Sequence, residues 1–306
     1  MSRGADPSVA AARRPLWRKL LLAGLSLVLV ALMLRWFEHQ QVYFPSRSLD
    51  WTPATAGWTF EDVRLETADG VTLHAWFLPA PARADGPGWT VLLFHGNGGN
   101  ISHRFDLYAL FRELGLDVLA VDYRGYGRSE GAPSESGTYL DAEAAWQWLA
   151  DRGVPGERML AYGESLGGAV ATELALRRKV GGLILQSTFT SVPDVGAELF
   201  PWLPVRWLMS IRYDTRAKLP RVRCPVLILH SRADTLIRFR HAERNYAAAR
   251  EPKLLWEIAG DHNEALLSEE GRRRWREGMR KFLETLPAKA GSATPESTEK
   301  RGAGSR

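Results

Sequence analysis

The chain has 306 residues, of which 45% are hydrophobic and 25% are charged, and its net charge is +5. This balance is ordinary for a folded globular chain and excludes a largely disordered protein. The single Cys excludes a disulfide framework and a cysteine-cluster metal site.

The excess positive charge lies at the two ends of the chain. Residues 1–19 carry a net charge of +4 and residues 287–306 a net charge of +2, so the body between them has a net charge of −1. A nearly neutral body argues against a nucleic-acid-binding surface, and we expect no nucleic-acid partner. Residues 287–306 combine small and polar residues without an apolar period, which predicts a disordered tail.

An apolar segment lies near the start of the chain. No charged residue occurs from Leu20 to Leu34, and Trp17, Trp36 and Phe37 flank this stretch. Because aromatic residues favour the headgroup level, the pattern predicts a helix that crosses a lipid bilayer. A cleaved signal peptide and a buried soluble helix are the alternatives. The bulky residues that end the stretch do not fit the small-residue cleavage pattern of a signal peptide.

The membrane segment sets the order of the predicted regions. A basic tail at 1–19 precedes the transmembrane anchor at 20–37, and a linker at 38–57 leads to a folded domain at 58–286. Because the basic residues precede the span, we expect a cytoplasmic N-terminus and a domain on the outer, periplasmic or lumenal side.

The folded domain alternates strand and helix patterns along the chain. Asp69-Gly70 lies between two alternating apolar runs, Phe60–Glu66 and Val71–Phe77, which is typical of a β-hairpin. Short continuous apolar runs, typical of strands buried on both faces, then occur at Trp89–Phe94, Val118–Val121, Met159–Tyr162, Leu183–Leu185, Val226–Leu229 and Leu254–Ile258. Helix patterns separate them at Arg104–Leu114, Tyr139–Leu149, Leu166–Arg178, Arg240–Ala249 and Glu264–Leu286. This alternation predicts a mainly parallel sheet with helices on both faces and a site at the carboxyl ends of the strands.

One strand end carries a G-x-S-x-G pattern centred on Ser165. A serine on such a tight strand-to-helix turn projects its Oγ away from the backbone, and a Cβ at position 163 or 167 would clash. The N–H of Leu166 then lies at a helix N-terminus, where negative charge is favoured. The pattern predicts that Ser165 is a nucleophile, with a chance match as the alternative.

A glycine-dense loop follows the strand that ends at Phe94. Ile101 stands where a dinucleotide-binding loop needs glycine, and no Lys-Ser/Thr pair follows, so two phosphate-binding patterns fail. We predict that the N–H of Asn97 is the second donor of an oxyanion hole and that His95 is structural. The later segment Asp122–Ser129 fits a structural turn better than a carboxylate-binding site.

A nucleophilic serine needs a base. In a sheet of this kind the expected order along the chain is the serine, then an Asp or Glu, then the histidine that acts as the base. His262 directly follows a predicted strand and is the predicted base. His241 falls in a predicted helix, where we expect it to be solvated, and His230 ends a strand, where it can support the site.

The base in turn needs a carboxylate to orient it. Asp234 lies in the loop after the strand at Val226–Leu229 and is the predicted acid. Asp194, Asp214 and Asp261 are the rival carboxylates.

The segment 190–218 has room for a short lid. It is apolar, and Pro201 and Pro204 break it into short pieces. We expect Phe200, Trp202 and Trp207 to contact the acyl group of a substrate, and a helix packed on the sheet is the alternative.

In these motifs the chain resembles the α/β-hydrolase superfamily, and within it the membrane-anchored BEM46-like/ABHD13-like group with a serine aminopeptidase S33-type domain. The resemblance covers about Trp58 to Leu286 and rests on Phe94–Asn100, Asp122–Ser129, Gly163–Gly168 and Pro225–His230. It implies an eight-stranded sheet, Ser165, Asp234 and His262 as a triad, and ester or thioester hydrolysis. The chain departs from the common pattern in carrying His230-Ser231 for His-Gly and Ala259–His262 for Gly-x-Gly-His.

We therefore expect a membrane-anchored serine hydrolase that transfers an acyl group from an ester or thioester to water without a metal or cofactor. The short lid favours a small or medium acyl ester, including a lipid-derived one. A peptidase or amidase of the same fold and a catalytically silent, membrane-tethered binding protein are the alternatives.

Overall fold

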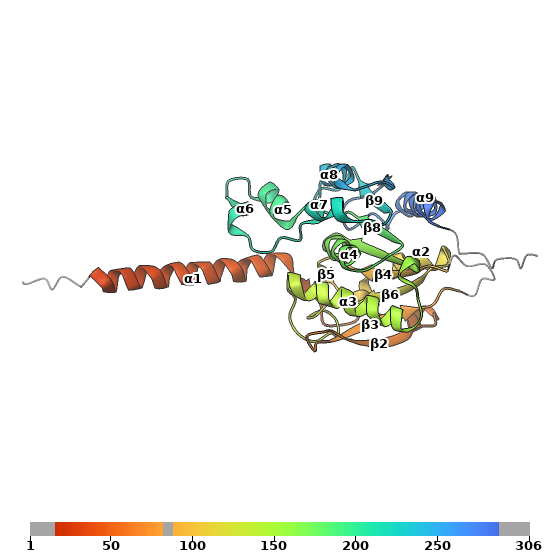
Figure 1. Ribbon diagram of the computed structural model, residues 1–306, viewed down its shortest axis with the longest axis horizontal. Helices are drawn as coiled ribbons and strands as arrows, with labels where there is room; N and C mark the ends of the chain where they lie inside the picture. Colours follow the sequence, from red (N-terminus) through yellow and green to blue (C-terminus); the bar gives the residue numbers. More distant parts are fainter. Residues whose placement is uncertain (1–15, 82–87, 288–306) are drawn as a thin grey trace, which may run out of the picture.

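The computed structural model describes residues 16–81 and 88–287. All but the first residue of the predicted tail at 287–306, and most of the predicted tail at 1–19, lie outside the described residues. Helix α1 (Leu16–Val42) projects from a domain built around a central sheet (Figure 1). Its 27 residues are long and apolar enough to cross a membrane by length and composition. It continues past Phe37, where the sequence predicted that the span ends.

The central sheet has eight strands in the order β10-β9-β8-β7-β4-β6-β3-β2. All neighbouring pairs are parallel except those that β3 makes with β2 and β6. Each strand corresponds to one of the eight predicted runs, and the predicted α/β-hydrolase fold is confirmed. The strands are β2 (Glu61–Glu66), β3 (Thr72–Leu78), β4 (Thr90–Phe94), β6 (Asp117–Val121), β7 (Met159–Glu164), β8 (Gly182–Gln186), β9 (Val226–Ser231) and β10 (Lys253–Ile258).

Helices cover both faces of the sheet, as the uninterrupted apolar strands require. Side chains alternate between the faces along β4, where Leu92 and Phe94 join one buried cluster and Val91 and Leu93 join the other. Helices α3 (Glu135–Asp151), α4 (Leu166–Arg177) and α8 (Arg240–Ala248) contribute to the first cluster. Helices α2 (Phe105–Glu113) and α9 (Glu269–Thr285) contribute to the second.

Helix α9 begins later than the sequence predicted. The prediction started at Glu264, but the helix begins at Glu269 because Ser268 caps it, with the Ser268 Oγ accepting a hydrogen bond from the Gly271 N–H at 3.0 Å. The residues between β10 and this cap form the loop that carries His262.

A second, two-stranded parallel sheet ties the end of α1 to the domain. It pairs β1 (Phe44–Pro45) with β5 (Gly98–Gly99) and was not predicted. The Phe44 N–H donates to the Asn97 carbonyl at 3.0 Å, and the Asn97 side chain donates to the Val42 carbonyl at 3.0 Å. Segment 38–57, predicted to be a linker, therefore starts inside α1 and then packs on the loop that carries Asn97.

The lid segment contains three short helices, α5 (Val192–Leu199), α6 (Val205–Leu208) and α7 (Thr215–Lys218). Pro201 and Pro204 lie between α5 and α6, as expected of residues that interrupt helices. The α5–α6 part extends away from the sheet and runs alongside the C-terminal part of α1 (Figure 1).

Candidate active site

A sharp turn joins β7 to α4 and carries Ser165. Ser165 has φ 52° and ψ −114°, in the positive-φ region that serine rarely adopts. A Cβ at position 163 would overlap the Gly167 backbone, and a Cβ at position 167 would overlap the Phe94 carbonyl. Both positions therefore require glycine, and the turn presents Ser165 at the carboxyl edge of the sheet.

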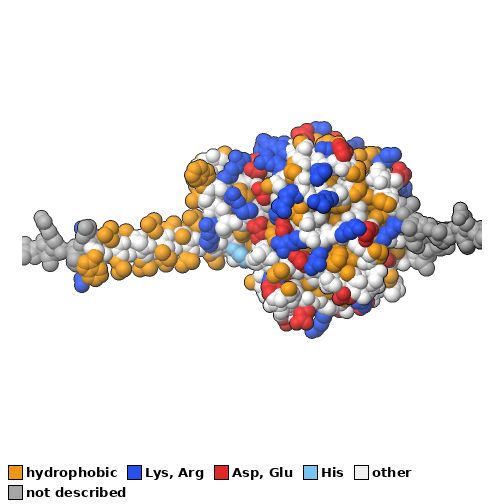
Figure 2. Space-filling model, viewed as in Figure 1, with side chains coloured by type: hydrophobic (Ala, Val, Ile, Leu, Met, Phe, Trp, Pro, Cys, Tyr) orange, Lys and Arg blue, Asp and Glu red, His pale blue; other side chains and the backbone are white. Residues whose placement is uncertain are grey.

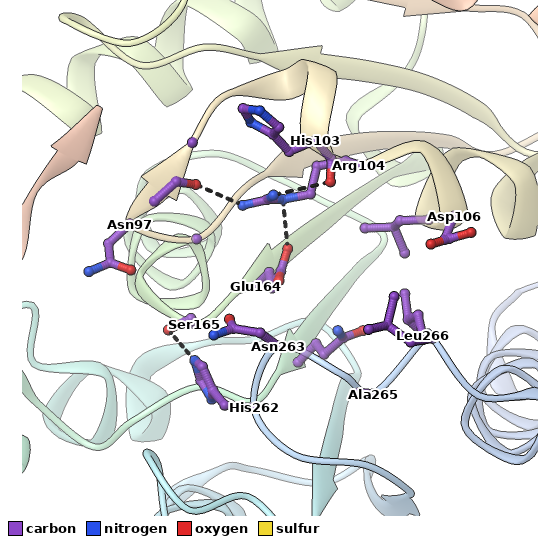
Figure 3. Close-up of a pocket in the computed structure, with 16 residues that line it drawn as sticks. Asn97, His103, Arg104, Asp106, Glu164, Ser165, His262, Asn263, Ala265 and Leu266 are labelled. Atoms are coloured by element: carbon purple, nitrogen blue, oxygen red, sulfur yellow. Dashed lines mark hydrogen bonds and ion pairs between the residues drawn. The ribbon is translucent and has the colours of Figure 1, made fainter. Parts of the chain in front are cut away.

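Ser165, His262 and Asp234 form a hydrogen-bonded series across the ends of three strands. The Ser165 Oγ lies 3.1 Å from His262 Nε2 (Figure 3). On the other side of the ring, His262 Nδ1 lies 2.7 Å from Asp234 Oδ2. The structure thus brings together the three residues that the sequence singled out as nucleophile, base and acid.

The carboxylate decides which nitrogen of His262 carries the proton. Because an ionised carboxylate only accepts hydrogen bonds, Nδ1 donates to Asp234. In the neutral ring Nε2 then accepts from the Ser165 hydroxyl. This is the arrangement in which an imidazole can remove the serine proton.

The loop around Asp234 holds its carboxylate in place. Oδ1 accepts hydrogen bonds from the N–H groups of Leu236 at 3.1 Å and Ile237 at 2.7 Å. His230 donates from Nε2 to the Ile237 carbonyl at 2.6 Å and lies 3.5 Å from Asp234 Oδ2. Burial lowers the pKa of His230 despite the opposing effects of Ile237 and Asp234. These contacts aim Oδ2 at His262.

Asp261 joins the loop of the acid to the loop of the base. Its Oδ1 accepts from the Thr235 N–H at 2.8 Å and from the His262 N–H at 2.7 Å. These backbone hydrogen bonds, with the Thr235 hydroxyl, lower the pKa of Asp261 below its usual value. Sequence reasoning treated Asp261 as a rival acid and missed this contact, which fixes the His262 backbone while Asp234 holds the ring.

Asn97 and Leu166 lie beside Ser165 and line one cavity with it. The Asn97 carbonyl accepts from the Tyr126 hydroxyl at 2.8 Å, in addition to its bond with Phe44. Within the described ranges, neither the Asn97 N–H nor the Leu166 N–H has a hydrogen-bond acceptor. Both N–H groups are therefore available to a substrate oxygen.

Buried polar residues brace the loop of Asn97 from behind. His95 Nδ1 donates to the Gly96 carbonyl at 2.7 Å, and Asp122 accepts from the Ile101 N–H at 2.8 Å. Burial would raise the pKa of Asp122, but the rings of His74 and His95, each with a nitrogen 3.5 Å from the carboxylate, and the hydrogen bond from Ile101 outweigh it and lower the pKa. Asp122 and the turn that follows it therefore support the site structurally.

Comparisons with known proteins identify the family. Residues 85–213 match the family described as serine aminopeptidase, S33. The chain is 39% identical over 236 residues to a Mycobacterium tuberculosis protein, Rv2307c, covering 76% of this chain and 83% of that relative. It is 35% identical to the alpha/beta hydrolase domain-containing protein WAV2 of Arabidopsis thaliana, covering 71% of this chain and 78% of WAV2. It is 31% identical to protein bem46 of Schizosaccharomyces pombe, covering 71% of this chain and 76% of that protein.

The chain belongs to the α/β-hydrolase family, in its Bem46-like group. Among solved structures, an esterase of Pyrococcus furiosus, Pf2001, has a TM-score of 0.62 at 22% identity and covers 79% of this chain and 98% of its own. That likeness shows the shared fold. The predicted family and the general class of hydrolase are confirmed.

A polar cavity of about 490 Å³ opens on one side of Ser165 in this α/β hydrolase (Figure 3). His262 lines it, together with an ion pair in which Arg104 Nε lies 3.0 Å from Glu164 Oε2. Arg104 also donates to the Gly98 carbonyl at 3.1 Å. Sequence reasoning missed this pair, because nothing local links the residue before Ser165 to the residue before α2.

An apolar cavity of about 400 Å³ opens on the other side of Ser165, between the lid and the end of α1. Phe200, which the sequence predicted to contact an acyl group, lies in the lining of this cavity. The structure places Trp202 and Trp207 outside this lining, with 75% and 91% of each residue exposed. The prolines at 201 and 204 turn the chain there, so its tryptophans face outward.

The rival acids and bases of the α/β hydrolase have other partners. Asp194 accepts from the Thr190 hydroxyl at 2.7 Å, and Asp214 caps α7. The prediction of a solvated His241 is wrong: His241 is buried, and its Nδ1 accepts from the Thr190 N–H at 3.1 Å, because the lid segment folds over α8. In the part of the chain that the structure describes, no group of three His, Cys, Asp or Glu side chains could hold a metal ion.

Proposed function

We propose that the chain is a membrane-anchored serine hydrolase that cleaves a carboxylic ester or thioester of small or medium acyl length. The observation that carries this proposal is the series from Ser165 through His262 to Asp234, with distances of 3.1 Å and 2.7 Å. Esters and thioesters suit it because acyl transfer requires only a nucleophile, a base and an oxyanion site.

The reaction follows from these positions. His262 Nε2 takes the proton of Ser165 as Oγ bonds to the substrate carbonyl carbon, and the N–H groups of Asn97 and Leu166 stabilise the oxyanion. Asp234 stabilises the imidazolium and holds its orientation. The imidazolium then gives its proton to the leaving alcohol or thiol as the C–O or C–S bond breaks. Water, activated by the same base, hydrolyses the acyl enzyme and restores Ser165.

A fluorophosphonate probe tests the nucleophile. The full chain in detergent should be labelled, with the adduct mapping to Ser165, and Ser165→Ala should remove the label. Ser187→Ala is a matched control, because Ser187 also follows a strand with positive φ, and its buried Oγ has no hydrogen-bond partner among the described residues. Labelling of Ser165→Ala at the wild-type level would refute the nucleophile, and an unlabelled wild type would favour a silent binding protein.

The anchor and its orientation form part of the proposal. Helix α1 meets the length and composition of a membrane span, and Arg18 and Lys19 precede its uncharged stretch. The positive-inside rule then favours a cytoplasmic N-terminus and an outer catalytic domain. Protease added to cells with a permeable outer layer should digest the domain and spare a tag placed before Arg3. A shortened domain recovered without membranes would instead indicate a cleaved signal.

The match to the S33 family favours one other candidate, hydrolysis of aminoacyl amides. An aminopeptidase needs a carboxylate for the substrate amino group. Glu164 lies next to Ser165 in the chain, but Arg104 already pairs with it at 3.0 Å. This pairing makes Glu164 a weaker partner for a free amine and supports the ester proposal. Asp106 also lines the polar cavity and is the carboxylate that an aminoacyl amide would have to use.

A further inference from the structure

The last turns of the apolar helix α1 form one wall of the apolar cavity. On this side the cavity is lined by Leu34, Phe37, Glu38, Gln41 and Val42, and on the other by residues of α5 and α6. Ser165 lies at its inner end with Asn97 and Leu166. The helix that the composition marks as a membrane anchor therefore also shapes the space beside the proposed nucleophile.

A buried carboxylate fastens α1 to the lid. Glu38 is 7% exposed, and its Oε1 accepts hydrogen bonds from the Ser210 N–H and the Ile211 N–H, both at 2.7 Å. Its Oε2 accepts from the Ser210 hydroxyl at 2.8 Å, and Arg35 donates both to Glu38 and to the Leu208 carbonyl. Charge-assisted bonds of this kind fix the lid segment against one face of α1.

The position of His262 decides which half of a substrate enters which cavity. His262 lines the polar cavity but not the apolar one, whereas Ser165 and Asn97 line both. Because His262 must protonate the leaving group, that group lies on the polar side, near Arg104. The acyl chain then extends the opposite way, into the space between the lid and α1.

The apolar cavity lies beside the part of α1 that we expect to leave the hydrocarbon core of the bilayer. Helix α1 has 27 residues, which at about 1.5 Å per residue span about 40 Å, against about 30 Å for the hydrocarbon core. Because only the four α1 residues from Leu16 to Lys19 precede the uncharged stretch from Leu20 to Leu34, most of the excess length of α1 lies beyond Leu34, among the residues that line the cavity.

The outer surface of the lid is apolar at this level. Trp202 and Trp207 are exposed and lie outside the cavity lining, and the α5–α6 segment lies alongside α1 (Figure 1). Leu199, Leu203 and Leu208 line the cavity and are also partly exposed. Figure 2 shows hydrophobic side chains along α1 and again at the tip of this segment. Exposed Trp and Leu beside a membrane helix are typical of a surface that contacts the interfacial zone of a bilayer.

We propose that α1 is part of the substrate site and that the acyl chain of a bilayer lipid ester enters the cavity sideways, between α1 and the lid. The polar alcohol of that lipid occupies the cavity beside Arg104 and Glu164. This inference rests on the proposed function and extends its acyl length from small or medium to the long chains of bilayer lipids. It also adds the direction of entry and the role of Phe37 as a contact for the acyl chain.

Two esters with the same leaving group test the proposal on the full chain reconstituted in phosphatidylcholine vesicles. 4-Methylumbelliferyl butyrate reaches the site from water, and 4-methylumbelliferyl palmitate is carried in the bilayer. Phe37→Ala should lower the ratio of the palmitate rate to the butyrate rate about tenfold, because the longer chain loses a contact that the shorter chain hardly uses. Trp36→Ala is the matched control, because Trp36 lies on the same turn of α1 but outside the cavity lining, and it should change neither rate.

The outcomes separate this inference from the proposed function. Hydrolysis of the butyrate by Phe37→Ala shows that the variant is folded and the chemistry intact. An equal palmitate rate in Phe37→Ala and Trp36→Ala, with butyrate still cleaved, would overturn the role of α1 and leave the serine hydrolase standing. Failure of the wild type to cleave either ester, together with an unlabelled Ser165, would overturn the proposed function itself.

Discussion

Two parts of the site, the turn that carries Ser165 (the floor) and the lid segment 190–218 (the roof), are held by different kinds of contact. The floor is the strand-to-helix turn of Ser165, where Gly163 and Gly167 pack against backbone atoms without room for a Cβ. The roof is the lid segment, whose short helices carry exposed apolar side chains. Hydrogen bonds to side chains of other elements hold it, among them those that Glu38 of α1 accepts from Ser210 and Ile211 and those that Glu135 of α3 accepts from Arg212 and Tyr213. Backbone packing therefore fixes the turn of Ser165, whereas the position of the roof depends on individual side chains and should respond to single substitutions.

The largest expected effect comes from the floor. Asp234→Asn should lower kcat about 10³- to 10⁴-fold with little change in KM, because the ring of His262 loses the carboxylate that sets its tautomer. Steady-state hydrolysis of 4-methylumbelliferyl butyrate measures this effect. Asp214→Asn is the control, since asparagine can also cap α7 and activity should stay within a few-fold. Equal losses of kcat in the two variants would contradict the role of Asp234 as the acid that orients His262.

The packing of the floor is tested by substitutions of two glycines, Gly167 in the first turn of α4 and Gly98 in β5. Gly167→Ala should cost more than about 3 kcal/mol of folding free energy, because its Cβ would overlap the Phe94 carbonyl. Gly98→Ala should be tolerated, since a Cβ there meets no atom within 4 Å. Thermal denaturation of both variants decides the point. Similar melting temperatures for the two variants would contradict the proposed rigidity of the floor.

Glu38→Ala tests whether the hydrogen bonds of Glu38 hold the lid segment against α1. Loss of the charge-assisted hydrogen bonds should expose the amides of Ser210 and Ile211, with hydrogen exchange about 10- to 100-fold faster. Hydrogen-exchange mass spectrometry on peptides of the lid segment makes this measurement. Glu113→Ala, which removes an exposed partner of Arg276, should leave those peptides unchanged. Unchanged exchange in Glu38→Ala would mean that the roof is held by other contacts.

A smaller effect is expected from His241, which lies on α8 where the lid segment packs against that helix. Burial lowers the pKa of His241 below its usual 6.5 in the folded chain. The unfolded chain therefore binds more protons as the pH falls through about 6.5, and stability present above that pH is lost on acidification. His241→Gln can still accept from the Thr190 N–H and should show a smaller drop in melting temperature between pH 7.5 and 5.5. An equal drop in variant and wild type would contradict this origin of the acid sensitivity.

The floor could be predicted from the sequence, because its signals are local. The glycines around Ser165 and the placement of Asp234 and His262 after apolar runs follow from what a tight turn and a parallel sheet require. The same logic gave the eight strands of the sheet and their adjoining helices with small errors at their ends.

The roof could not be predicted in the same way. Glu38 and Ser210 meet across 172 positions, and the pairing of Phe44 with Gly98 has no local signature. His241 was misjudged because its surroundings come from the lid segment, not from its own helix. The outward direction of Trp202 and Trp207 depends on how two prolines turn the chain, which composition does not specify.

The acyl-length dependence of kcat/KM tests the central claim, that floor and roof together form an acyl ester hydrolase. With p-nitrophenyl esters of rising chain length, each methylene that enters the apolar cavity should contribute up to about 0.8 kcal/mol, or about fourfold, until the cavity is full. Aminoacyl amides measured alongside should be slower. A flat or falling response from the shortest ester upward, together with faster cleavage of the amides, would contradict the account and favour a peptidase.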